Sequence, residues 1–99
     1  MYNFNKNDFA EIMQRKYGIV VDKRQVGEES INLYKDELDE QFISQEMKNE
    51  LPMRLVCQTC SYISKNDEWI ISIFLDEDNN SPVLLVCLEN GVTILEERV

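Results

Sequence analysis

Two cysteines three residues apart, Cys57 and Cys60, are the first residues of this chain whose types and spacing could do chemistry. In a redox protein, the first thiol of a C-x-x-C pair sits at a helix N-terminus, whose dipole stabilises the thiolate. Here the pair lies within an apolar run typical of a strand, where side chains three apart point to opposite faces. A closed zinc site takes four ligands, and the chain adds only Cys87 and no His. We therefore expect core cysteines, with neither a bound metal nor a cofactor.

The acidic run 76–81 is a second candidate, because it begins like a calcium-binding loop with oxygen-bearing side chains at its first, third and fifth positions. Such a loop also needs Gly at its sixth position, for a sharp turn, and a bidentate Glu at its twelfth. This chain has Ser81 and Cys87 at those positions. The run therefore predicts a solvated hairpin turn.

Other enzyme chemistry finds little support in the sequence. The absence of His excludes nucleophilic catalysis by a Ser–His pair, and no glycine-rich phosphate loop occurs. Nineteen acidic residues guarantee that some carboxylates lie close together, so their number points to no site. We therefore predict a protein that is not an enzyme and has no catalytic residues.

Ninety-nine residues with 43% apolar and 29% charged side chains predict one domain, residues 1–99, with a single core. No uncharged apolar run reaches the roughly 18 residues of a membrane-spanning helix, so we expect no membrane contact. The N-terminal segment lacks the apolar run of a signal peptide, and an odd number of cysteines argues against a disulfide framework. We therefore expect a cytoplasmic protein.

An apolar stripe at helical spacing predicts a first helix near the N-terminus. Asn7 is the expected N-cap, because an Asn side chain accepts hydrogen bonds from the free amides of a first turn, and Gly18 is expected to follow the last turn. The stripe consists of Phe9, Ile12, Met13 and Tyr17. The β-branched run 19–21 predicts a short edge strand after this helix.

Residues 28–51 fit two patterns. Apolar residues three and four apart favour one long helix of about six turns, which Pro52 ends, and we prefer this interpretation. The competing interpretation makes a strand around Ile31 and Leu33, because residues 30–34 alternate, and begins a shorter helix near Asp39. Whether residues 28–38 are helix or strand stays open.

After Met53 the chain becomes rich in β-branched and aromatic residues, in four runs separated by turn-forming residues. The runs are 55–63, 69–75, 83–88 and 92–95. Asn90-Gly91 predicts a two-residue type I′ hairpin, because both central residues of that turn need positive φ. The predicted fold is therefore α+β, with two N-terminal helices packed on a four-stranded antiparallel β-meander. Residues 1–52 form the mainly helical half and residues 53–99 the β-meander half.

The two middle strands of the predicted meander are apolar on both faces, whereas a strand with one wet face should alternate. Helices on both faces of the sheet would explain this pattern. The alternative is that a partner or a second copy covers one face, because a large exposed apolar patch usually marks an interface. The seam would then contain either Ile70 and Phe74 or the alternate set of Trp69 and Ile71.

Ten Lys and Arg against nineteen Asp and Glu give a formal net charge of −9, which disfavours direct binding to nucleic acids. Residues 1–27 carry +2, residues 28–50 carry −6 and residues 51–99 carry −5. The charge is densest from Glu28 to Glu50, and within this region we name four residues the acidic segment: Asp36, Glu37, Asp39 and Glu40. On a helix these carboxylates would repel one another. The segment is either a solubilising surface or a single-sign surface that attracts a basic partner.

These observations predict a small acidic protein that binds another protein with a basic surface. The first hypothesis is an inhibitor or regulator that occupies the basic groove of a nucleic-acid-handling protein. It resembles DNA-mimicking inhibitors of restriction and CRISPR proteins in size and charge alone. The acidic segment would supply the charge, and Tyr34 or Tyr62 an aromatic anchor. The alternatives are an immunity protein or antitoxin that neutralises a cognate toxin, and a homodimeric structural or regulatory module.

Overall fold

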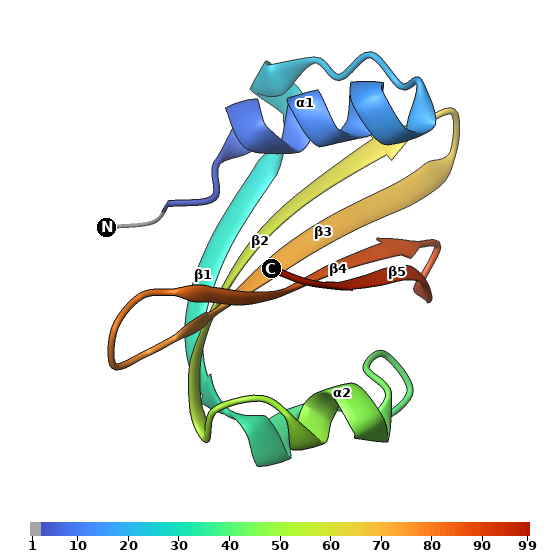
Figure 1. Ribbon diagram of the computed structural model, residues 1–99. Helices are drawn as coiled ribbons and strands as arrows, with labels where there is room; N and C mark the ends of the chain where they lie inside the picture. The colour runs from blue at the N-terminus through green and yellow to red at the C-terminus, as the bar shows by residue number, and fades with distance from the viewer. Residues whose placement is uncertain (1–2) are drawn as a thin grey trace.

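Five antiparallel strands, paired in the order of the sequence, form the sheet of this α+β protein, seen in the computed structural model of residues 3–99 (Figure 1). The strands are β1 (Gly27–Tyr34), β2 (Arg54–Ser64), β3 (Asp67–Asp76), β4 (Pro82–Glu89) and β5 (Val92–Arg98). Strands β2 to β5 correspond to the four predicted runs. The predicted four-stranded sheet is therefore wrong by one strand, because β1 adds to it beside β2.

Short turns connect β2 to β3 and β4 to β5. Asn90 and Gly91 have φ values of 52° and 80°, which confirms a two-residue turn with positive φ at both positions. Lys65 and Asn66 form the matching turn between β2 and β3, with φ values of 52° and 72°. Asn and Gly tolerate this backbone region better than most residues, so the sequence of the β4–β5 turn favours the observed hairpin.

The first helix, α1 (Lys6–Tyr17), has its N-cap two residues before the predicted position. Asn5 caps it in place of Asn7, since the Asn5 Oδ1 accepts hydrogen bonds from the backbone amides of Asn7 (2.9 Å) and Asp8 (3.2 Å). The Asp8 carboxylate in turn accepts from the Asn5 amide at 3.1 Å, completing a reciprocal capping box. Gly18 follows the helix with φ of 68°, as predicted.

Replacing Asn5 by Ala should lower the free energy of unfolding by about 1 kcal/mol, because the first turn then loses its side-chain acceptor. Urea unfolding followed by circular dichroism measures this change. Asn7→Ala is the matched control, since the Asn7 side chain makes no capping hydrogen bond, and it should change stability by less than about 0.5 kcal/mol. Equal losses in the two variants would contradict the Asn5 cap.

Residues 28–51 do not form the preferred long helix. They contain most of β1, the 3₁₀ turn η2 (Lys35–Glu37) and a short helix, α2 (Gln45–Asn49). The competing interpretation is therefore nearer the structure, although α2 starts well after Asp39. The run 19–21 is no strand either and leads into the 3₁₀ turn η1 (Lys23–Gln25). The edge position that it was expected to fill belongs to β1.

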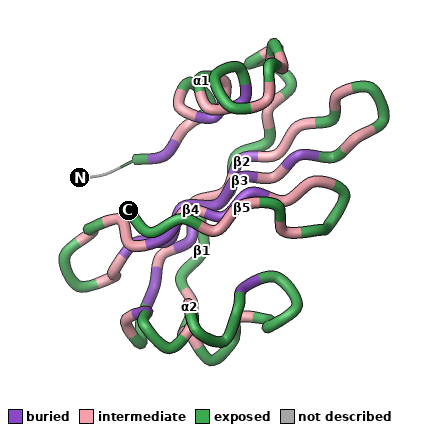
Figure 2. Tube along the Cα trace, turned by 45° about the vertical axis from the view of Figure 1, so that its right-hand side comes forward, coloured by how far each residue is buried: buried purple, intermediate pink, exposed green. Residues whose placement is uncertain are grey.

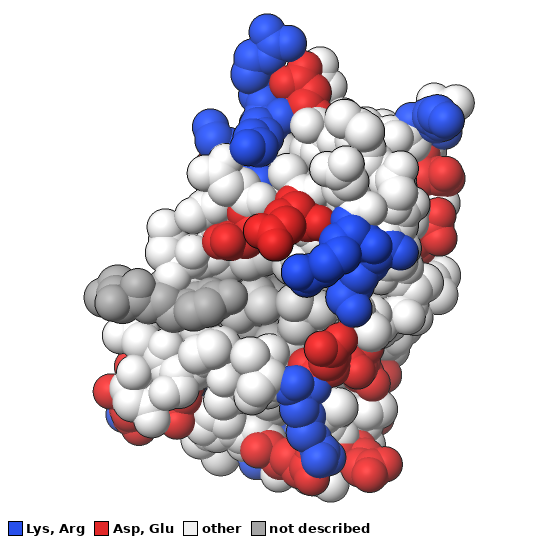
Figure 3. Space-filling view, turned by 45° about the horizontal axis from the view of Figure 1, so that its top comes forward, with Lys and Arg blue, Asp and Glu red and all other residues white. Residues whose placement is uncertain are grey.

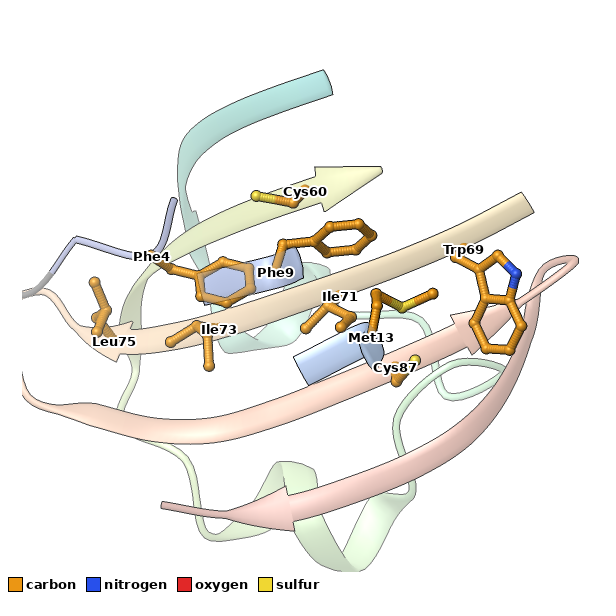
Figure 4. Close-up of a cluster of buried hydrophobic side chains, with 9 residues drawn as sticks. All are labelled: Phe4, Phe9, Met13, Cys60, Trp69, Ile71, Ile73, Leu75 and Cys87. Atoms are coloured by element: carbon orange, nitrogen blue, oxygen red, sulfur yellow. The ribbon is translucent and has the colours of Figure 1, made fainter. Parts of the chain in front are cut away.

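The helices lie on opposite faces of the sheet, and buried residues concentrate along its central strands (Figures 1 and 2). We name these faces the α1 face and the α2 face. The α1-face cluster contains Phe4, Phe9, Met13, Cys60, Trp69, Ile71, Ile73, Leu75 and Cys87 (Figure 4). The α2-face cluster contains Ile43, Leu51, Leu55, Cys57, Phe74, Leu84 and Val86.

Coverage from both sides explains why β3 and β4 are apolar on both faces. Helix α1 packs along one face, and residues 38–51, which include α2, pack on part of the other. Of the two explanations that the sequence left open, the structure shows helices on both faces, and residues 38–51 leave part of the α2 face uncovered. Within the described residues, no helix has both the length and the apolar composition that a membrane crossing requires.

Candidate protein-binding surface

The three cysteines lie in the core, as the sequence predicted, and the C-x-x-C pair is divided between the two faces of the sheet. Cys57 belongs to the α2-face cluster, whereas Cys60 and Cys87 belong to the α1-face cluster. Burial raises the pKa of all three thiols, that of Cys60 to about 12. A buried thiol with a raised pKa supplies little thiolate near neutral pH, so none of them has the environment of a nucleophile. Among residues 3–99, no group of three or more His, Cys, Asp or Glu side chains is arranged to hold a metal ion.

The acidic run 76–81 forms the turn between β3 and β4. The backbone closes it through the Asp76 amide on the Ser81 carbonyl at 2.9 Å and the Asn80 amide on the Asp76 carbonyl at 2.8 Å. The side-chain oxygens of Asp76 and Asn79 accept from the amides two residues ahead, in Asx-turn fashion. This geometry confirms the predicted hairpin turn.

The acidic segment lies in the connection that follows β1. All four of its carboxylates are exposed, and Tyr34, at the end of β1, is 55% exposed. The Glu37 carboxylate accepts from the Tyr34 amide at 2.8 Å, and the Asp39 carboxylate accepts from the Gln41 amide at 2.8 Å. No Lys or Arg of the described chain forms an ion pair with the segment. Its negative charge is therefore uncompensated at short range.

The two alternate sets of sheet residues lie on opposite faces of the sheet. Trp69 and Ile71 lie beneath α1, with Tyr17 packed on Trp69 at a ring-centroid distance of 4.9 Å, so they are unavailable to a partner. Ile70 and Phe74 lie on the α2 face and line a groove.

Tyr62, one of the two predicted aromatic anchors, is half-buried. Its hydroxyl accepts a hydrogen bond from the Asp22 amide at 3.2 Å, so it is not an exposed anchor.

This groove, which we name the acidic-rimmed groove, has a volume of about 400 Å³. Its floor comes from β3 and β4, and one wall comes from residues 37–43. The lining residues are Glu37, Leu38, Asp39, Phe42, Ile43, Ile70, Ser72, Phe74, Val86 and Leu88. Apolar side chains make up most of the lining, and its only charged members are the two acids.

Specific hydrogen bonds fasten the groove's wall to the rest of the fold. The Thr93 hydroxyl of β5 donates to the Phe42 carbonyl at 2.6 Å, and the Ser44 amide donates to a Glu96 carboxylate oxygen at 2.7 Å. The Lys48 ammonium donates to the Leu38 carbonyl at 3.1 Å. These bonds hold an irregular segment in place, so the groove is formed before any partner binds.

The floor of the groove contains one polar side chain, that of Ser72. Ser72, 8% exposed, has its hydroxyl 2.8 Å from the Thr59 hydroxyl, which lies 3.4 Å from the Cys57 sulfur. This short chain satisfies the polar atoms in an otherwise apolar floor. The titratable member of this chain of hydrogen bonds is the Cys57 thiol, whose pKa is raised by burial, so it supplies little thiolate to act as a base toward Ser72.

The fold thus brings together residues from both predicted sets. Glu37 and Asp39 of the acidic segment share the groove with Ile70 and Phe74, whereas Asp36, Glu40 and Tyr34 are not part of its lining. Sequence reasoning missed the other six lining residues, which are Leu38, Phe42, Ile43, Ser72, Val86 and Leu88. The hairpin register could have indicated Val86 and Leu88, because an antiparallel β3–β4 pair places them beside the Ile70 and Phe74 face.

Charge is distributed differently on the side of the molecule that carries α1. There, basic and acidic side chains alternate over the surface (Figure 3). Arg15 pairs with Glu11 at 3.5 Å, and Lys16 pairs with Glu97 at 3.7 Å. Within each pair the opposite charges neutralise each other locally, in contrast to the unpaired acidic segment.

Comparisons of the chain with protein-family models, curated proteins and solved structures found no match.

Proposed function

We propose that this protein is a non-enzymatic inhibitor or regulator that binds another protein, with the acidic-rimmed groove as its contact site. The observation that carries the proposal is the junction of an apolar floor with two carboxylates on the rim, Glu37 and Asp39. The partner segment that fits it is basic and presents one apolar side chain. A protein with a basic nucleic-acid-binding surface offers segments of this kind.

The apolar floor supplies the affinity in this proposal. Ile70 and Leu88 are only half-buried, and Phe42 is 37% exposed, so the groove leaves apolar area open to water. Burying one large apolar side chain of a partner contributes about 1.5–3 kcal/mol. Because hydrogen bonds already hold the wall, little conformational entropy is lost on binding.

The acids supply the orientation and the rate of encounter. Uncompensated carboxylates at the rim attract Lys or Arg on either side of the partner's anchor, and they repel acidic segments. Pure imitation of a nucleic-acid backbone would require spaced charges alone. The apolar floor beside the acids therefore favours a contact with a protein segment that combines charge with an anchor.

A direct probe of this proposal is a basic amphipathic helical peptide of about 14 residues, with Leu on one face of the helix and Lys on the other. Calorimetric titration should show binding that weakens as salt rises, since the rim charges are exposed and screened. Glu37→Lys with Asp39→Lys should weaken the binding at least about tenfold, by replacing two attractions with two repulsions. Methyl NMR signals of Ile70, Val86 and Leu88 should shift on titration.

The matched control changes the same charge on the other side of the molecule. Glu11→Lys with Glu97→Lys alters the net charge equally, and it removes only two exposed ion pairs of little energetic value. This variant should keep most of the affinity. The proposal fails if both double variants weaken binding equally, if the methyl shifts lie on the α1 face, or if a Glu/Leu peptide binds as well.

A further inference from the structure

The outer edge of β1 pairs with no other strand among residues 3–99. All eight residues of β1 pair with β2 in an unbroken register, from Gly27 opposite Ser61 to Tyr34 opposite Arg54. Seven of the eight are exposed, and Ile31 at the middle is 48% exposed. An edge strand presents a row of amide and carbonyl groups that another strand can pair with.

The other edge of the sheet differs in ways that discourage pairing. The β4–β5 register shifts between Cys87 and Leu88, and β5 ends in three charged residues, 96–98. Irregularities and charges of this kind protect edge strands from association. Strand β1 has neither an irregular register nor a proline, and its residues 30–34 carry no charge.

We propose that β1 pairs antiparallel with β1 of a second copy, about a two-fold axis through Ile31. The two five-stranded sheets then join into one continuous sheet. A two-fold axis perpendicular to the sheet joins the α1 face of one copy to the α1 face of the other, and likewise the two α2 faces. Residues that lie directly opposite each other must therefore project from the same face. With the axis at Ile31, Glu29 lies opposite Leu33 and Glu28 lies opposite Tyr34 of the second copy.

The side chains of β1 complement themselves in this register. Leu33 packs against the α2-face cluster, and Ile31 shares its face, so two Ile31 and two Leu33 side chains extend that cluster across the axis. Lys35 of one copy lies diagonal to Glu29 of the other, within reach of an ion pair. On the α1 face, Ser30 lies opposite Asn32, and both side chains can hydrogen bond.

Neighbouring registers fit less well. An axis at Asn32 would place Ile31 opposite Leu33 and Glu29 opposite Lys35, but it would also bring Glu28 opposite Asp36 of η2, which is a destabilising like-charge pair. An axis at Ser30 would place Glu29 opposite Ile31 and would separate the two Ile31 side chains. The register centred on Ile31 joins the apolar residues without placing two carboxylates directly opposite each other.

This inference goes beyond the proposed function, because the acidic-rimmed groove has its floor on β3 and β4. Pairing through β1 leaves both grooves of the dimer open. The two associations also respond oppositely to salt. Copies with a net charge of −9 repel each other, so screening should strengthen the dimer while it weakens the binding of a basic peptide.

Sedimentation velocity from micromolar to millimolar protein tests the dimer directly, with a reductant present. Ile31→Lys places two ammonium groups at the axis and should raise the dimer dissociation constant roughly tenfold or more. Ile63→Lys is the control, since Ile63 is 66% exposed on β2 and shares the α2 face but is not on the edge strand. Thermal unfolding of both variants checks that they fold.

Cysteine substitution on β1 reads out the register. Under mild oxidation Ile31→Cys should give a covalent dimer, because identical residues meet at the axis, whereas Ser30→Cys and Asn32→Cys should cross-link far more slowly. The native thiols are buried and so do not compete. The proposal is overturned by a monomer at all concentrations, by a dimer that Ile31→Lys leaves intact, or by equal cross-linking at the three positions.

Discussion

Replacing Phe9 by Ala is expected to lower the free energy of unfolding by about 3–5 kcal/mol. Phe9 is fully buried, and α1 places it over the sheet in the α1-face cluster (Figure 4). Its ring meets Tyr62 edge to face, at a centroid distance of 6.5 Å. Since a domain of this size has a total stability of about 5–15 kcal/mol, the variant should lose a large part of it. Urea unfolding, followed by the fluorescence of Trp69, measures the loss.

Two further variants separate the cavity from other effects. Phe9→Leu keeps most of the apolar volume and should cost less than Phe9→Ala. Val20→Ala should change stability by less than about 0.5 kcal/mol, because Val20 is 80% exposed. A loss below about 1 kcal/mol in Phe9→Ala would mean that α1 contributes little to the core.

The elements that local sequence dictates could be predicted. Strands β2 to β5 combine β-branched and aromatic residues with distinct turns, and Asn90-Gly91 determines the last hairpin through its backbone preferences. The stripe from Phe9 to Tyr17 indicates α1, because one side of that helix alone is buried. In each case a local pattern and the final contacts agree.

Strand β1 could not be predicted from its own residues, because its conformation depends on pairing with a strand that is distant in the sequence. Ile31, Tyr34, Leu38 and Phe42 happen to follow helical spacing. An edge strand with seven exposed residues has little of the buried-and-exposed alternation that identifies a strand. Pairing with β2, which lies about thirty residues further along the chain, decides the conformation. Local propensity is easily overridden in such a segment.

The candidate site was predictable only in parts for the same reason. The acidic segment and the two alternate sheet sets were visible as residue types, but which sheet face α1 covers depends on tertiary packing. That choice removes Trp69 and Ile71 from the surface and leaves Ile70 and Phe74 beside Glu37. Phe42 joins them because a hydrogen bond from the Thr93 hydroxyl of β5 fixes its backbone carbonyl, a contact between residues about fifty positions apart.

Raising the pH above about 9 is expected to destabilise the folded protein. Burial raises the pKa of Cys57, Cys60 and Cys87 above that of a free thiol, so the folded chain holds protons that the unfolded chain has released. Stability falls with rising pH wherever the folded state binds more protons. The contribution is intact below the thiol pKa of the unfolded chain and is lost toward that of the folded chain, which is about 12 for Cys60.

Ionisation of Cys60 in the unfolded chain should lower the free energy of unfolding by up to about 1.4 kcal/mol per pH unit in this window, or about 2 kcal/mol between pH 9.5 and 11.5. Urea unfolding in the presence of a reductant measures the slope against pH. Cys60→Ala should flatten the slope by that amount, whereas Val56→Ala, on the same strand and beside the same cluster, should leave it unchanged. Both variants create a cavity, but only the first removes a titrating group. Equal slopes in the two variants would therefore show that Cys60 titrates in the folded protein as it does in the unfolded chain.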